Sequence, residues 1–123
     1  MLKKILIATI SALVLCACNS ITEEAPRRIN FDRSSAVIID VRTPEEFKVE
    51  HIESARNIPI ASLRERAAGE FANKSQNIVV YCNRGINSKK AKCILEGEGY
   101  TNVTDAGSIR NLKLDFKSVK EGK

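Results

Sequence analysis

The sequence contains no run of apolar residues long enough to span a membrane, which needs roughly 20 of them. Its most apolar stretch, residues 5–15, is shorter and is broken by Thr9 and Ser11. The sequence also lacks a cysteine and histidine cluster with metal-ligand spacing, a Walker-type phosphate loop and a dinucleotide fingerprint. No basic run alternates with aromatic residues, and the formal net charge of +5 is mild. We therefore expect no metal, no other cofactor and no nucleic-acid partner.

The first 17 residues have the features of an export signal in their usual order. Lys3 and Lys4 come first, the apolar residues 5–15 follow, and the small residue Ala17 precedes a cysteine. Cleavage would remove this segment and, with it, two of the positive charges. The alternative is a hydrophobic N-terminus without a signal function, or a short anchor.

The sequence Leu15-Cys16-Ala17-Cys18 resembles the bacterial lipobox, which ends in a cysteine preceded by a small residue. The resemblance implies cleavage before Cys18, a lipid on the Cys18 sulfur, and attachment to the periplasmic side of a bacterial membrane. Asn19 follows in place of the aspartate associated with retention at the inner membrane, so the outer membrane is favoured. A plain secretory signal that is cut nearby is the alternative.

The remaining chain is expected to consist of a tether and one domain. Residues 18–35 are polar, charged and without periodicity, which predicts a tether between the membrane and the folded part. Residues 36–123 have the length of a single domain, and they contain no internal repeat. We expect ordered structure to start at Ala36.

Short β-branched runs predict strands buried on both faces at residues 36–41 and 77–81. Briefer strands are expected at residues 57–59 and 103–104. In parallel sheets, functional sites form at the carboxyl ends of the strands. Cys82 stands at such an end, because it directly follows the strand at residues 77–81.

Three helices are expected between these strands. The sequence Thr43-Pro44-Glu45-Glu46 is typical of a helix start, with a capping box and a proline in the first turn. A second capping box begins at Ser62 and predicts a helix that ends near Phe71. A third helix is expected over residues 88–98, with Gly99 as its stop. Strands that alternate with helices predict an α/β fold with a mainly parallel sheet covered on both sides.

The loop from Cys82 to Ser88 connects a buried strand to the start of a helix. A cysteine at this place faces loop N–H groups and the positive end of the helix dipole, and both stabilise a thiolate and a nearby anion. Gly85 can adopt the positive φ that turns the loop amides inward, and Arg84 adds a positive charge. The alternative, from the loop alone, is a buried structural cysteine.

Several motifs along the chain together resemble the rhodanese family of sulfurtransferases. They are Asp40 to Phe47, His51-Ile52, Ala55, Asn57 to Pro59, Val80 to Ser88, Gly99-Tyr100, Val103 and Ala106-Gly107. The similarity extends from about Ala36 to Leu112. It implies a rhodanese-like, three-layer α/β domain whose mainly parallel central sheet is flanked by helices.

The resemblance also implies a reaction and a site. Cys82 would be the catalytic nucleophile, which takes a sulfur from thiosulfate or a similar small anionic donor and carries it as a persulfide to cyanide or a thiol. The loop after it would bind the sulfur and the donor. This loop consists of Asn83, Arg84, Gly85, Ile86, Asn87 and Ser88.

Three positions depart from the pattern that is usual in this family. The family's loop often has an arginine after its glycine, whereas the only arginine of this loop, Arg84, precedes Gly85. Glu50 and Ser108 stand where glycines are common. We expect these differences to affect donor preference and catalytic strength more than the fold.

Four further residues are expected to be structural. Asp40 would accept hydrogen bonds at a strand end, Arg42 would anchor a loop, and His51 would pack rather than act as a base. Cys93 would be a small buried residue near the apolar face of its helix, too far from Cys82 to form a disulfide with it.

Two other functional classes stay open. The first is a non-catalytic or partner-directed rhodanese domain that carries sulfur or presents a surface. The second, less favoured, is a cysteine phosphatase or arsenate reductase. Such enzymes need an arginine six residues after the cysteine to clamp a tetrahedral oxyanion, and this chain has Ser88 at that place.

Overall fold

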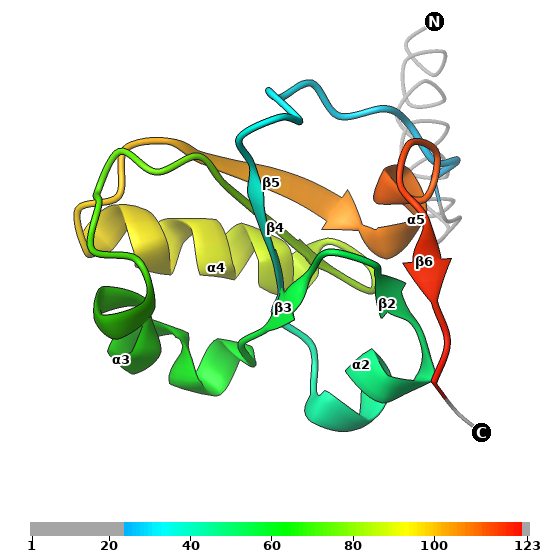
Figure 1. Cartoon of the computed structure of the whole chain (residues 1–123), viewed down its shortest axis with the longest axis horizontal. Coiled ribbons are helices and arrows are strands. Elements are labelled where there is room, and N and C mark those ends of the chain that lie inside the picture. Colours follow the sequence, from blue (N-terminus) through cyan, green and yellow to red (C-terminus); the bar gives the residue numbers. More distant parts are fainter. Residues whose placement is uncertain (1–23, 122–123) are drawn as a thin grey trace, which may run out of the picture.

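The computed structural model describes residues 24–121, which fold around a four-stranded parallel sheet. Its strands are β1 (Val37–Asp40), β3 (Arg56–Asn57), β4 (Ile78–Cys82) and β5 (Val103–Ser108), in the order β3-β1-β4-β5. The helices are α2 (Pro44–Val49), α3 (Ile60–Glu70), α4 (Ile86–Gly97) and α5 (Ile109–Leu112). The predicted α/β fold, with its mainly parallel sheet flanked by helices, is confirmed (Figure 1).

Two short strands outside this sheet were not expected. β2 (His51–Ile52) and β6 (Ser118–Val119) pair antiparallel and form a separate two-stranded ribbon. Next to this ribbon, the backbone N–H of Glu53 donates to the carbonyl of Lys117 at 2.9 Å. The ribbon therefore fixes the last described residues of the chain beside the segment that follows α2.

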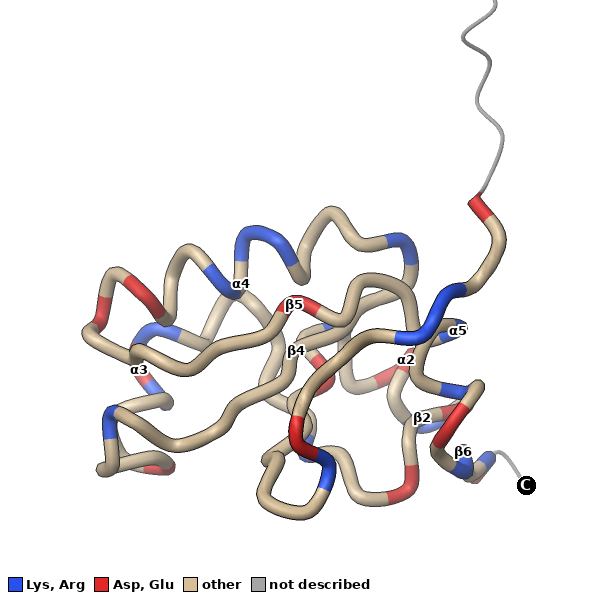
Figure 2. The backbone as a smooth tube through the Cα atoms, turned by 90° about the horizontal axis from the view of Figure 1, so that it is seen from above, with Lys and Arg blue, Asp and Glu red and all other residues tan. Residues whose placement is uncertain are grey.

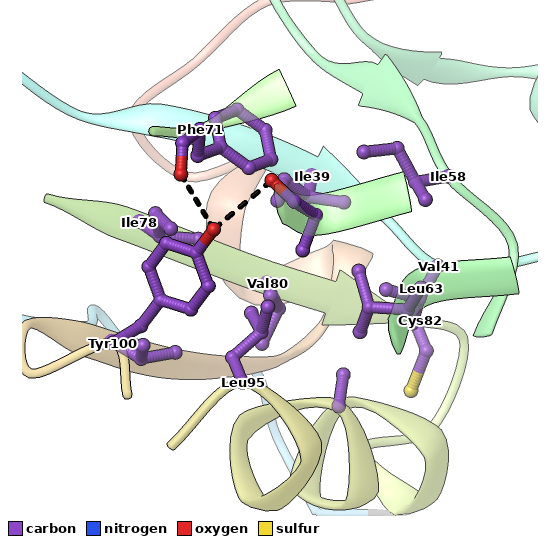
Figure 3. Packing of buried hydrophobic residues seen from close by; sticks show 13 residues of the cluster. Ile39, Val41, Ile58, Leu63, Phe71, Ile78, Val80, Cys82, Leu95 and Tyr100 are labelled. Carbon is purple, nitrogen blue, oxygen red and sulfur yellow. Dashed lines mark hydrogen bonds between the residues drawn. The ribbon is translucent and has the colours of Figure 1, made fainter. Parts of the chain in front are cut away.

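Side chains of the central strands alternate between two apolar clusters, one on each face of the sheet. On the first face, Ile39 and Val80 pack with Leu63 of α3 and Leu95 of α4 (Figure 3). The side chain of Cys82 belongs to this cluster, and its sulfur points toward α4 (Figure 3). The alternation of β4 thus places the thiol on the face that α4 covers.

The second face is covered by α5 and by the chain upstream of β1. Ile38 and Tyr81 of the sheet pack with Leu112 of α5, and Ile29 and Phe31 pack against the same cluster. The polar segment before Ala36 therefore contributes apolar contacts to the domain, although its composition predicted a tether. Figure 2 shows this segment running beside the domain.

An ion-pair cluster also holds the upstream segment. The guanidinium of Arg33 lies 2.7 Å from one carboxylate oxygen of Asp115, and that of Arg28 pairs with the other. The ring of Phe31 stacks on that of Phe116, with 6.0 Å between their centroids. The predicted signal peptide and the predicted lipidation site, Cys18, lie outside the described residues. Within residues 24–121, no helix is both long and apolar enough to cross a membrane.

The predicted helix starts are confirmed at one helix and wrong at two. In α2, the Thr43 hydroxyl accepts the N–H of Glu46, and the Glu46 carboxylate accepts the N–H of Thr43, which completes the capping box. Helix α3 begins at Ile60 rather than at Ser62, because the N–H of Ile60 finds an acceptor in the carbonyl of Val41 at 3.1 Å. A contact with the residue that directly follows β1 has replaced the local cap.

Helix α4 begins at Ile86, two residues before the predicted start at Ser88. The reason is Gly85, which adopts φ +95 and caps the helix without a side-chain hydrogen bond. At the other end, Gly99 has φ +99 and follows the helix as predicted.

Candidate active site

The sulfur of Cys82 lies at the start of α4 and accepts hydrogen bonds from the backbone. The N–H of Gly85 is 3.0 Å from Sγ, and the N–H of Ser88 is 3.3 Å from it. Groups at a helix start have no carbonyl partner within the helix. Cys82 therefore takes the place of a capping side chain, in a position where the helix dipole stabilises negative charge on sulfur.

A cavity of about 370 Å³ opens in front of this sulfur. It is lined by Arg42, Glu46, Cys82, Asn83, Arg84, Ile86 and Asn87. Cys82 is only 3% exposed, whereas Ile86 at the cavity is 66% exposed. The structure thus places all the predicted loop residues around one sulfur. Four of them are exposed and line the cavity, and the other two, Gly85 and Ser88, contact the sulfur through their backbone amides.

A buried ion pair connects the end of strand β1 to the loop that follows Cys82. The guanidinium of Arg42 donates to both carboxylate oxygens of Asp40, at 2.9 Å from Nε and 2.7 Å from Nη2. The same guanidinium donates to the Asn83 side-chain oxygen at 3.0 Å and to the Glu50 carbonyl at 2.5 Å. Burial alone would lower the pKa of Arg42, but the hydrogen bonds and charge of Asp40 outweigh it and raise the pKa. The structural roles expected of Asp40 and Arg42 are confirmed.

Asn83 is held from its other side by helix α2. Its amide donates to the Glu46 carboxylate at 2.6 Å, so that Glu46 both caps α2 and fixes the loop. Burial would raise the pKa of Glu46, but hydrogen bonds from Thr43 and Asn83 lower it below its ordinary value. Glu46 is therefore an anionic wall of the cavity. The sequence revealed only its capping role.

The loop also rests on the turn between β5 and α5. A Cβ on Gly85 would lie 3.6 Å from Cα of Gly107, and both glycines have positive φ. The side-chain amide of Asn111 donates to the Ala106 carbonyl at 2.8 Å and lies 3.0 Å from where a Cβ of Gly107 would be. A Cβ at position 85 would make an ordinary contact, so the positive φ is what favours glycine there, whereas at position 107 the nearby amide of Asn111 adds to the same preference.

Two polar residues of the domain, Ser88 and His51, are buried. The Ser88 hydroxyl is fully buried and has no hydrogen-bond partner among the described residues. His51 is buried and stacks on Phe47, with 3.6 Å between ring centroids, so its expected packing role is confirmed.

Cys93 is exposed, and the prediction of its burial is wrong. The buried side of α4 carries Ala91 and Leu95, and position 93 points away from it.

The rhodanese-like domain model matches residues 22–113, and the chain therefore belongs to the rhodanese-like family. It is 42% identical over 76 residues to the thiosulfate sulfurtransferase PspE of Escherichia coli K12, an alignment that covers 62% of this chain and 73% of that protein. The solved structure described as a rhodanese with anions from E. coli superposes with a TM-score of 0.65 at 40% identity, covering 69% of this chain and 98% of that one. These similarities support sulfurtransferase activity.

Some relatives are enzymes with a different activity. The tRNA uridine(34) hydroxylase of Buchnera aphidicola is 32% identical over 76 residues, which cover 58% of this chain. The alignment covers 24% of that protein, so the chain spans about a quarter of its length. The similarity thus concerns one rhodanese-like portion of a longer enzyme.

Proposed function

We propose that this protein is a thiosulfate sulfurtransferase in which Cys82 carries the transferred sulfur as a persulfide. One observation carries the proposal: Sγ of Cys82 accepts two backbone N–H groups at the start of α4 and faces a cavity. A sulfur in this position can hold negative charge before attack and after release. A buried structural cysteine would not need a cavity in front of it.

The first half-reaction transfers sulfur from the donor to the enzyme. The Cys82 thiolate attacks the outer sulfur of thiosulfate and forms a new sulfur–sulfur bond. The original sulfur–sulfur bond breaks, and its electron pair leaves with sulfite. The product is the Cys82 persulfide, whose negative outer sulfur is stabilised by the loop amides.

The second half-reaction returns the enzyme to its starting state. Cyanide or a thiolate attacks the outer sulfur, and the bond to Sγ of Cys82 breaks. Cys82 leaves as a thiolate, and the acceptor becomes thiocyanate or an organic persulfide. Arg84 and Asn83 at the cavity would orient the anionic donor, while the exposed Ile86 adds an apolar edge.

The loop lacks the guanidinium that the alternative phosphatase reaction would require. Clamping a tetrahedral oxyanion requires a guanidinium at position 88. The residue there is Ser88, whose hydroxyl is buried under the loop. The composition of this loop therefore favours the binding of a single transferred sulfur atom over the binding of a phosphate group.

The test is the formation of thiocyanate from thiosulfate and cyanide by the purified protein and by two matched variants. Cys82→Ser should abolish the activity, because a hydroxyl is a far weaker nucleophile of similar volume. Cys93→Ser should retain it, because Cys93 is exposed and lies outside the cavity. If Cys93→Ser abolished the activity and Cys82→Ser retained it, the nucleophile would be Cys93 and the proposal would be wrong. Hydrolysis of a phosphate ester that depends on Cys82 would indicate a phosphatase, and no turnover with any donor would indicate a carrier or binding domain.

We further propose that the protein is exported and held by a lipid on Cys18 at the periplasmic side of a membrane, the outer membrane in a two-membrane cell. The support is the order of charged, apolar and small residues that ends in Leu15-Cys16-Ala17-Cys18. Intact-mass spectrometry of membrane-derived protein should show a chain that begins at Cys18 and carries acyl groups. Cys18→Ser should lose that mass, whereas Cys16→Ser should keep it.

A further inference from the structure

A second and larger cavity adjoins the Cys82 cavity. Its volume is about 520 Å³, and Asn83 and Arg84 line both cavities. Its other walls come from α4, from the turn between β5 and α5, and from the upstream segment that begins at Glu24. Thiosulfate is a single tetrahedral anion and fits the Cys82 cavity alone. The proposed reaction with cyanide leaves this larger space without a role.

The walls of the second cavity carry an excess of positive charge. Four basic side chains line it, namely Arg27, Arg84, Lys89 and Arg110, and only two acidic ones do, namely Glu24 and Asp105. Lys and Arg residues lie both along α4 and in the upstream segment that passes the domain (Figure 2). A ligand that carries more than one negative charge would complement these walls.

The two acidic side chains are already engaged. The Glu24 carboxylate lies 3.5 Å from the Arg27 guanidinium, and the Asp105 carboxylate accepts the N–H of Gly107 at 2.9 Å. In the part of the chain that the structure describes, no ion pair involves Arg84 or Lys89. These two cations remain available to a ligand, and Arg84 stands between the two cavities.

We infer that the second cavity binds the carboxylate-bearing body of an organic thiol that accepts the sulfur, and that this thiol reaches past Asn83 and Arg84 to the Cys82 persulfide. This inference rests on the proposed function. Cavities of this size bind small organic ligands, and carboxylates form strong charge-assisted hydrogen bonds with Arg and Lys. The acceptor thiol loses its proton to solvent and attacks the outer sulfur. Cys82 is released as a thiolate, and the acceptor leaves as a persulfide.

Charge reversal at one of two neighbouring lysines tests the inference. Lys89 and Lys90 are both exposed on α4, but only Lys89 lines the cavity. Lys89→Glu and Lys90→Glu therefore change the net charge equally. With thiosulfate as donor, kcat/KM is measured for mercaptosuccinate, which has two carboxylates, and for neutral 1-thioglycerol. The ratio of the two values cancels changes in the intrinsic reactivity of the persulfide.

Lys89→Glu should lower this ratio by about tenfold or more, the loss expected when a hydrogen bond to a charged group is removed. Lys90→Glu should change it less than about twofold, as expected for an exposed charge that does not line the cavity. If both variants changed the ratio equally, or if neither changed it, the inference would be overturned. The proposed function would be unaffected as long as the protein still transferred sulfur to cyanide. A wild-type protein that transfers no sulfur even to cyanide would overturn the proposed function first.

Discussion

Arg42→Met should destabilise the domain strongly and also impair sulfur transfer. The side chain of Arg42 is 8% exposed, and the side chain of Asp40, whose charge it neutralises, is fully buried. Methionine keeps the length and much of the volume of the arginine stem, so packing changes little. The carboxylate of Asp40 would keep the backbone N–H of residue 42 at 2.9 Å but would lose every hydrogen bond from the guanidinium.

The expected loss is about 3–5 kcal/mol, which is the usual cost of removing one partner of a buried ion pair. Single domains are stable by about 5–15 kcal/mol, so the variant would lose a large part of its stability. Arg42→Lys should lose less, because it keeps the charge. It should still impair transfer, since an ammonium lacks the fork that reaches Asp40, Asn83 and the Glu50 carbonyl together.

Urea unfolding followed by circular dichroism gives the free energies, and thiocyanate formation without urea gives the activities. Asp40→Asn combined with Arg42→Met removes both charges and should be more stable than Arg42→Met alone. An Arg42→Met protein within about 1 kcal/mol of wild type would refute the reasoning, because that value is typical of an exposed pair. A double variant no more stable than Arg42→Met would also refute it.

Three further outcomes are expected. Arg84→Ala should lower kcat/KM for thiosulfate by the equivalent of about 1–3 kcal/mol, measured with cyanide as acceptor, and unchanged kinetics would mean that Arg84 does not bind the donor. Gly85→Ala should cost about 1–2 kcal/mol in urea unfolding, because its φ of +95 is unfavourable for alanine, and a neutral effect would contradict that conformation. Hydrogen bonds from Lys113 and Ser118 lower the pKa of Glu50, so its contribution to stability is present above its ordinary pKa of about 4.5 and is lost as the pH falls through the lower folded value. Glu50→Gln should therefore flatten the fall of stability with acid, and an unaltered pH profile would show that Glu50 contributes nothing.

The elements with strong local signals were predictable from the sequence. The runs that form β1 and β4 are short, apolar and β-branched, and a sheet covered on both faces requires that pattern. The capping box at Thr43 involves only residues within one helical turn. The position of Cys82 followed from β4 alone, because the strand ends where its apolar run ends. Local chemistry determines each of these features.

The errors arose where a distant contact or a backbone conformation replaced a local signal. Helix α3 does not begin at the capping box of Ser62, because the N–H of Ile60 bonds to the carbonyl of Val41, just after β1 and far from α3 in the sequence. The sulfur of Cys82 accepts N–H groups at the start of α4, so that helix needs no capping side chain at Ser88. β2 and β6 are two residues each and lie far apart in the chain, and no local pattern identifies such a pair.

Two of the three departures from the usual family pattern have structural explanations away from the sulfur. Glu50 has an extended backbone that any residue can adopt, and its carboxylate accepts the Ser118 hydroxyl at 2.6 Å and pairs with Lys113 at 2.8 Å. Ser108 has φ −78, and its hydroxyl caps α5 by accepting the N–H of Arg110 at 3.0 Å. Neither position needs a glycine, because neither backbone enters the left-handed region.

The third departure is the one that changes the chemistry of the site. An arginine after Gly85 would stand at the first turn of α4, where the exposed Ile86 now gives the Cys82 cavity an apolar edge. Moving the arginine to position 84 places its charge on the wall between the two cavities. There it can serve an anion on either side, the donor in front of Cys82 or the body of an acceptor next to it. The position of this one guanidinium, rather than the loss of a charge, is therefore what should distinguish the substrate preference of this chain within its family.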